Sequence, residues 1–170
     1  MAIPPFLAEL RSLVGTRPLW LSAVVAVVLD DDNRVLLARR RDDGRWAPVG
    51  GILDPGEEPA EGAVRECREE TGVEVVPELL TSVSATPVVE YPNGDRTQYL
   101  VLCFRCRPVG GEARVNDDES LEVGWFDLDA LPEMTETELR RITLARDCEG
   151  EAVFEYSGRT SGPLPSHHRG

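Results

Sequence analysis

Lysine is absent from this sequence of 170 residues, so all 18 of its basic residues are arginines. Acidic residues number 31, which gives a formal net charge of −13. Proteins that bind nucleic acids usually carry a basic face, so this balance predicts that the partner is not a nucleic acid. Any cationic side chain that contacts a phosphate must then use the planar, bidentate guanidinium group of arginine.

Long apolar runs are also absent. The run Trp20–Leu29 stops at about ten residues, roughly half of what a membrane-spanning helix needs. Its many valines favour a buried strand instead. The N-terminus has no basic stretch followed by an apolar region of the kind that directs secretion. We therefore expect one soluble domain in the cytoplasm, without contact to a membrane.

Cysteine and histidine contribute little to the predicted chemistry. Cys103 and Cys106 lie three residues apart in a strand-like run, so they are expected to point to opposite faces. The spacing fits neither a zinc ribbon nor a disulfide framework, which predicts free, partly buried thiols at all four positions: Cys67, Cys103, Cys106 and Cys148. Both histidines, His167 and His168, lie in a tail over 157–170 that is predicted to be disordered.

Apolar periodicity and turn residues predict helices and strands in mixed order, and therefore a mixed sheet with helices on both sides. We expect an accessory helix within residues 1–18 and one main domain over 19–156. The first predicted elements are a helix ending at Gly15, two strands over 20–29 and 34–40 joined by a hairpin-type turn, and a helix beginning at Pro59 and ending at Gly72. Strands within 73–84 and 86–106 follow, with a hairpin at Asn93–Gly94. The last predicted elements are a turn over 108–112, a strand over 121–128 and a helix capped by Thr135.

The segment Gly50–Val75 contains seven glutamates. Its helix gathers four small or apolar side chains on one side, which is the expected core face: Ala60, Ala63, Val64 and Cys67. On a different face, Glu66, Glu69 and Glu70 stand at positions i, i+3 and i+4. Each like-charged pair destabilises an isolated helix by a few tenths of a kcal/mol.

Divalent cations offset such repulsion, because Mg²⁺ and Mn²⁺ prefer carboxylate oxygens. A solvated acidic surface is the alternative interpretation. The upstream loop favours the metal site, since Gly50, Gly51 and Gly56 can adopt positive φ and bring the backbone close to a ligand. Gly62 is expected to leave room on the glutamate face for metal, water and phosphate. Arg65 is expected to orient Glu57 through an ion pair.

The run "GILDPGEEPAEGAVRECREETGV" resembles the signature of the Nudix hydrolase (MutT-like) family. Eight of its nine positions agree, and Cys67 departs at an aliphatic position, where a buried thiol acts as a small hydrophobe. The matching residues are Gly51, Glu57, Arg65, Glu66, Glu69, Glu70, Gly72 and Val73. The resemblance implies the family's α/β/α sandwich with a mixed sheet, here preceded by a short N-terminal helix.

By the same resemblance, Glu66, Glu69 and Glu70 are ligands of Mg²⁺, with Mn²⁺ as a possible substitute, and the Gly51 region adds a backbone carbonyl. Water would attack one phosphorus of a nucleoside diphosphate linked to a group X. Glu69, Glu70 and Arg65 would form the catalytic set with Glu119, which resembles the additional glutamate of nucleotide-sanitising members. A solvated acidic loop is the alternative interpretation for Glu119.

Candidate substrate-binding residues lie just before the motif and on the hairpin that follows it. Arg39, Arg45, Trp46 and Tyr99 are the candidate substrate-binding residues, although the arginines can also be surface residues and the aromatic rings core residues. We expect a small nucleotide substrate, with ADP-ribose or a sugar nucleotide favoured over 5′-triphosphorylated RNA. The alternatives are a nucleoside triphosphate pyrophosphohydrolase and a nucleotide-binding regulator without activity. An isomerase of isoprenyl diphosphates would want a cysteine before the motif, and none precedes Cys67.

The N-terminal helix carries an apolar stripe that includes Phe6, Leu10 and Leu13, and Trp20 follows it. Large apolar side chains of this kind need cover. A homodimer contact is one expectation. The alternative is that the helix packs on the sheet of its own chain.

Overall fold

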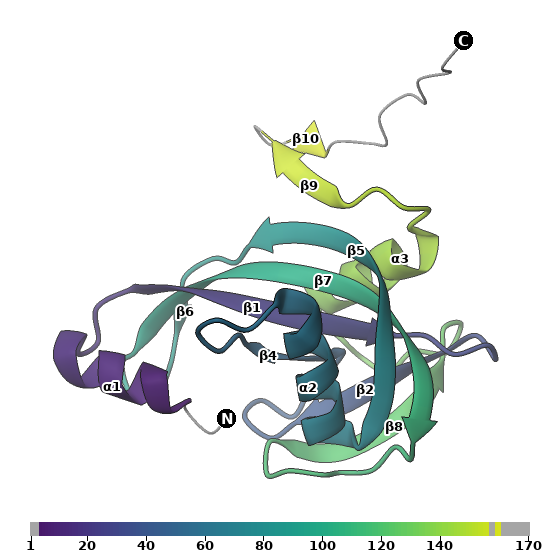
Figure 1. Ribbon diagram of the computed structural model, residues 1–170, viewed down its shortest axis with the longest axis horizontal. Coiled ribbons are helices and arrows are strands. Elements are labelled where there is room, and N and C mark those ends of the chain that lie inside the picture. Colours follow the sequence, from purple (N-terminus) through teal and green to yellow (C-terminus); the bar gives the residue numbers. More distant parts are fainter. Residues whose placement is uncertain (1–3, 157–158, 161–170) are drawn as a thin grey trace.

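The structure is a computed structural model that describes residues 4–156 and 159–160. Within these residues, two sheets and three helices form a layered arrangement (Figure 1). Nearly all of the predicted tail over 157–170, with both histidines, lies outside the described residues. The elements are α1 (Pro5–Val14), β1 (Leu19–Val28), β2 (Arg34–Arg40), β3 (Trp46–Ala47), β4 (Val49–Ile52), α2 (Pro59–Thr71), β5 (Val73–Ala85), β6 (Val89–Glu90), β7 (Arg96–Gly111), β8 (Ser120–Asp127), α3 (Glu136–Asp147), β9 (Val153–Tyr156) and β10 (Arg159–Thr160).

The larger sheet has the strand order β10-β9-β5-β7-β1-β4, and β6 pairs with the first residues of β7. Its central strands β1 and β7 pair in parallel, whereas β4 pairs with β1 and β5 pairs with β7 in antiparallel orientation. The smaller sheet has the order β3-β2-β8. The predicted mixed sheet is therefore confirmed. Within the described part of the chain, no helix is both long and apolar enough to cross a membrane.

The turn between β1 and β2 forms as predicted, but its strands separate. Asn33 adopts a positive φ of 62°, and the Asp30 N–H donates to the Arg34 carbonyl at 3.0 Å. A single bridge joins Leu29 to Val35. Beyond it, β1 continues in the larger sheet and β2 in the smaller one, so the hairpin opens into two layers.

Helices α2 and α3 cover opposite faces of the larger sheet. Alternate side chains of β1 divide between them, because successive strand residues point to opposite sides. Val24, Ala26 and Val28 belong to the cluster under α2, and Val25 and Val27 belong to the cluster under α3. This division is the α/β/α arrangement that the sequence predicted.

The two cysteines of β7 follow the same alternation. Cys106 lies in the cluster under α2 and Cys103 in the cluster under α3. All four cysteines are free, as expected. The predicted turn over 108–112 is wrong, because β7 stays paired with β5 up to Gly111, opposite Val73. Bulges in β5 let this long strand pair bend. Gly110 and Gly111 are the last residues of β7 and still pair with β5, so they do not reverse the chain.

Helix α1 packs on the sheet of its own chain, which was the alternative expectation. Leu7 is buried against Leu21 and Ile52. The Arg11 guanidinium donates to the Arg96 carbonyl at 2.9 Å and to the Thr97 hydroxyl at 2.8 Å, so the helix is also tied to the β6–β7 hairpin.

Two apolar side chains near α1 remain uncovered. Leu13 is 78% exposed and Trp20 is 56% exposed. Trp20 does not extend the stripe of α1, because its neighbour Leu21 points to that helix and strand side chains alternate.

Candidate metal and catalytic site

Helix α2 carries the acidic face, and its ends follow from the local sequence. Pro59 lies in the first turn, where its missing N–H leaves no hydrogen bond unmade. Gly72 follows the last turn in the left-handed conformation, with φ 71°, and its N–H donates to the Arg68 carbonyl at 3.0 Å. Ala63 and Cys67 are fully buried in the core. The glutamates consequently gather at the side of the helix that the apolar stripe leaves open.

The three glutamates of this face differ in exposure. Glu70 is 8% exposed, the Glu66 side chain 14% and the Glu69 side chain 49%. Burial, together with the charges of Glu66, Asp117 and Glu119, raises the pKa of Glu70 to about 8. Burial also raises the pKa of Glu66. A cation placed here would stabilise carboxylates that the protein itself solvates poorly.

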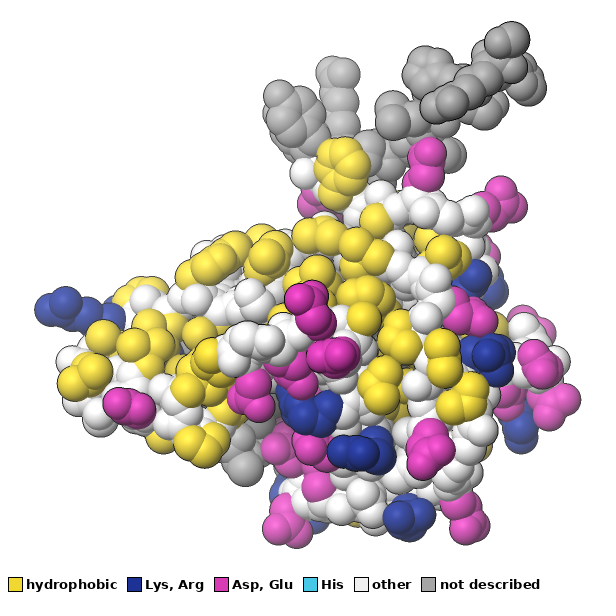
Figure 2. Space-filling view, in the orientation of Figure 1, with side chains coloured by type: hydrophobic (Ala, Val, Ile, Leu, Met, Phe, Trp, Pro, Cys, Tyr) yellow, Lys and Arg dark blue, Asp and Glu magenta, His cyan; other side chains and the backbone are white. Residues whose placement is uncertain are grey.

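Arg65 forms the predicted pair with Glu57 and extends beyond it. Its Nε donates to Glu57 Oε1 at 2.7 Å and its Nη2 to Glu57 Oε2 at 2.9 Å. Nη1 reaches Glu66 at 2.8 Å and Glu69 at 3.1 Å. The hydrogen bonds from Arg65 hold the pKa of Glu57 below its usual range. Figure 2 shows acidic and basic side chains gathered over α2, beside an apolar area over the larger sheet.

Gly51 brings the backbone of β4 against the glutamate face. A Cβ at this position would overlap the Glu66 carboxylate. The predicted close approach is therefore present, but its cause is different. Gly50 and Gly51 are strand residues without positive φ, and only Gly56 of the three has one, at 86°.

Gly62 does not open space for metal or phosphate, and that prediction is wrong. It is buried, and a Cβ there would overlap the Leu53 side chain and stand 3.1 Å from Glu57 Oε2. The missing side chain instead lets the loop before α2 pack on the helix.

Glu119 meets Glu70 from a different part of the fold. Both line a small cavity of about 50 Å³ between the two sheets, together with Ala38, Arg40, Asp42, Ala47, Pro48, Gly50 and Ser120. The Glu119 carbonyl accepts from the Arg41 N–H at 2.9 Å. The loop that contains Glu119 is therefore attached to the end of β2. Arg40, which was not among the candidate substrate-binding residues, also lines this cavity, and its guanidinium binds Asp42.

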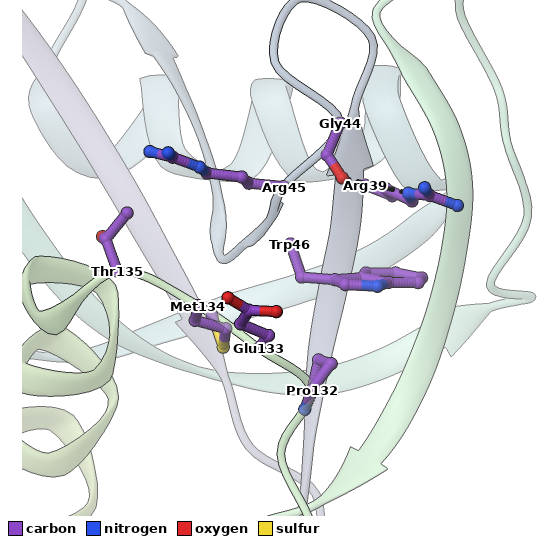
Figure 3. Close-up of a pocket in the computed structure, with 8 residues that line it drawn as sticks. All are labelled: Arg39, Gly44, Arg45, Trp46, Pro132, Glu133, Met134 and Thr135. Atoms are coloured by element: carbon purple, nitrogen blue, oxygen red, sulfur yellow. Dashed lines mark hydrogen bonds between the residues drawn. The ribbon is translucent and has the colours of Figure 1, made fainter.

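A second cavity of about 560 Å³ collects three of the four predicted substrate residues (Figure 3). Arg39 and Arg45 extend from the β2–β3 hairpin in opposite directions, and Trp46 lies below them. The Trp46 ring packs edge-on against Phe126, with 4.7 Å between centroids, so it serves the core and the cavity together. Sequence reasoning did not place in a binding site the segment that forms the other wall of this cavity: Pro132, Glu133, Met134 and Thr135.

The order of elements, the acidic helix face and the preceding glycines together coincide with a known family. The NUDIX domain model matches residues 20–146. The chain belongs to the Nudix family. It is 38% identical over 143 residues to a MutT-like protein of Streptomyces ambofaciens, covering 84% of this chain and 87% of that one.

Further comparisons agree with this Nudix assignment. An ADP-ribose pyrophosphatase of Methanocaldococcus jannaschii is 33% identical over 121 residues, covering 68% of this chain and 69% of the relative. The crystal structure of a UDP-X diphosphatase superposes with a TM-score of 0.62 at 26% identity, covering 82% of this chain and 67% of that chain. The protein is a Nudix hydrolase.

Nudix hydrolases generally use divalent metals, and the donor atoms of this site suit them. Among the described residues, no three acidic, cysteine or histidine side chains converge as a complete ligand set. Arg65 instead contacts Glu66 and Glu69. The available donors are carboxylate oxygens and the backbone at Gly51, where the missing side chain lets the Glu66 carboxylate lie against the strand. Oxygen donors of this kind fit Mg²⁺ or Mn²⁺.

Tyr99 lies apart from both cavities. Its hydroxyl is 2.7 Å from that of Tyr91, and its ring packs on the apolar cluster under α1. The structure therefore brings together Arg39, Arg45 and Trp46, and separately Glu70 and Glu119, while Tyr99 belongs to the attachment of the N-terminal helix.

Proposed function

We propose that this Nudix hydrolase is a metal-dependent pyrophosphohydrolase that cleaves the diphosphate of a nucleoside diphosphate linked to X. The meeting of Glu70 and Glu119 in one cavity carries the proposal. The two residues come from α2 and from the loop before β8, and their shared position is costly for like charges unless a cation is bound. Cytoplasm is the compartment we propose for it.

Gly51, Glu66, Glu69 and Glu70 would hold the Mg²⁺, through one carbonyl and three carboxylates. A bound Mg²⁺ would polarise the phosphoryl oxygens and lower the pKa of an attacking water. Arg65 orients Glu57 and balances charge beside Glu66. Glu119 is our candidate for the group that takes the proton from the water, because it stands beside the glutamate face without belonging to α2.

The larger cavity would receive the nucleoside or the group X. Trp46 offers an aromatic face to a base, and Arg45 offers a guanidinium group to a phosphate. The volume of about 560 Å³ lies in the range of small-molecule sites. ADP-ribose or a sugar nucleotide is the favoured substrate, and the names of the two relatives above support this class. Nucleoside triphosphates are the second candidate, which the position of Glu119 favours.

Hydrolysis assays test the proposal. We expect cleavage of ADP-ribose or of a UDP-sugar with Mg²⁺ and none after EDTA treatment. Glu70→Gln should lower kcat by about 100-fold or more while the protein stays folded. Glu61→Gln is the matched control, because Glu61 lies on the exposed side of the same helix. Full activity of Glu70→Gln, or equal loss in the control, would contradict the proposed metal site.

A further inference from the structure

The C-terminal end of α2 is closed by a segment from outside the helix. The last four carbonyls of an α-helix lack partners within it. Here the Asn116 side-chain amide donates to the carbonyls of Arg68 and Glu69, both at 3.1 Å. The Asn116 N–H donates to the Glu70 carbonyl at 3.1 Å. One residue thus binds the backbone of two of the glutamates on the proposed metal face.

Three residues later the same segment supplies Glu119. Between them, the Asp117 carboxylate accepts from the N–H groups of Glu119 at 3.0 Å and Ser120 at 3.3 Å. On the far side, the Arg41 Nε donates to the Asp118 carbonyl at 2.6 Å. Residues 116–119 are therefore fixed to α2 at their beginning and to the end of β2 at their end.

The acidic side chains around this attachment repel one another. Residues 116–119 bring Asp117 and Glu119 within electrostatic reach of Glu70, near the end of the helix. A helix C-terminus is itself the negative end of the helix dipole. Repulsion therefore favours a loop that swings away, and the neutral amide of Asn116 supplies the donors that oppose this movement.

We propose that Asn116 is a positioning residue that holds Glu119 beside Glu70 by binding the backbone carbonyls at the end of α2. The inference rests on the proposed function, because it gives Glu119 a task in the reaction. Asn116 itself touches neither the substrate nor the metal in this scheme. Its effect on the rate passes through Glu119.

The first test is hydrogen exchange of the metal-free protein. Asn116→Ala removes both side-chain donors, and Asn116→Asp keeps the shape while it replaces the donors with a charge. Both variants should exchange faster over residues 112–120 than the wild type. Asn93→Ala is the control, because Asn93 makes comparable side-chain bonds in the exposed β6–β7 hairpin. Unchanged exchange over 112–120 in both Asn116 variants would overturn the proposal.

The second test is a double-mutant cycle with Glu119→Gln. We expect Asn116→Ala to lower kcat by about 10-fold and to change KM by less than about threefold. In the Glu119→Gln background the same substitution should add little, because the two residues act as one unit. An equal loss of kcat in the wild type and in the Glu119→Gln variant would show that Asn116 does not act through Glu119. A wild-type protein without hydrolase activity would refute the proposed function instead, and the exchange result would still decide the role of Asn116.

Discussion

Removing the Glu70 carboxylate should change how the stability of the metal-free protein depends on pH. Glu70 is buried, and its pKa is raised from 4.5 to about 8. Between these values the unfolded chain releases the proton while the native state keeps it. The free energy of unfolding therefore falls as the pH rises through this window. Each pKa unit corresponds to about 1.4 kcal/mol, so the loss amounts to roughly 4 kcal/mol by pH 8.

The Glu70→Gln variant has no carboxylate to titrate at this position, so its free energy of unfolding should not fall in this window. Urea unfolding in EDTA at pH 5, 6.5 and 8 measures the free energy of unfolding. The variant should gain on the wild type by a few kcal/mol between pH 5 and pH 8, whereas Glu61→Gln should follow the wild type. Saturating Mg²⁺ at pH 8 should then stabilise the wild type more than Glu70→Gln. A difference between Glu70→Gln and wild type that stays constant from pH 5 to pH 8 would refute the reasoning.

Cys67→Val should leave kcat within about twofold and change stability by less than about 1.5 kcal/mol, because the buried thiol fills space and makes one long polar contact, 3.7 Å from the Thr71 hydroxyl; kinetics and thermal unfolding check both. Arg11→Ala should destabilise the protein by about 2 kcal/mol, since several hydrogen-bond acceptors lose their donor, whereas Arg17→Ala, at an exposed position, should not. Light scattering tests the homodimer contact through α1 that the sequence predicts: a monomeric full-length protein would exclude it, and a dimer should be lost when residues 1–16 are deleted.

The fold and the acidic helix were predictable because their signals are local. The ends of α2 depend on Pro59 and Gly72, and the cap of α3 depends on Thr135, whose hydroxyl accepts from the Glu138 N–H at 3.3 Å. The pairing of Arg65 with Glu57 follows from the helix and the loop directly before it. In each case the partners lie within about ten residues of one another along the chain.

The errors concern contacts that depend on tertiary packing. Helical projection placed Gly62 on the glutamate face, but only the fold shows Leu53 against it. Tyr99 is β-prone and aromatic, which suits a substrate site and a core equally. The wall of the larger cavity around Glu133 has no motif, because its role comes from its position opposite the β2–β3 hairpin.

The arrangement of the arginines bears on the size of the substrate. In the part of the chain that the structure describes, ten arginines form ion pairs with acidic side chains. Most of the positive charge is thus already neutralised. A polyanion such as RNA gains affinity chiefly when unpaired cationic side chains neutralise its phosphates and its counterions are released. Arg45 differs, because its side chain lines the larger cavity without an ion pair among the described residues. One such guanidinium suits a single phosphate group, so kcat/KM for ADP-ribose or a UDP-sugar should exceed kcat/KM for a triphosphorylated RNA oligomer. Arg45→Ala should lower kcat/KM for the small substrate mainly by raising KM. A tenfold preference for the RNA would show that the charge argument fails.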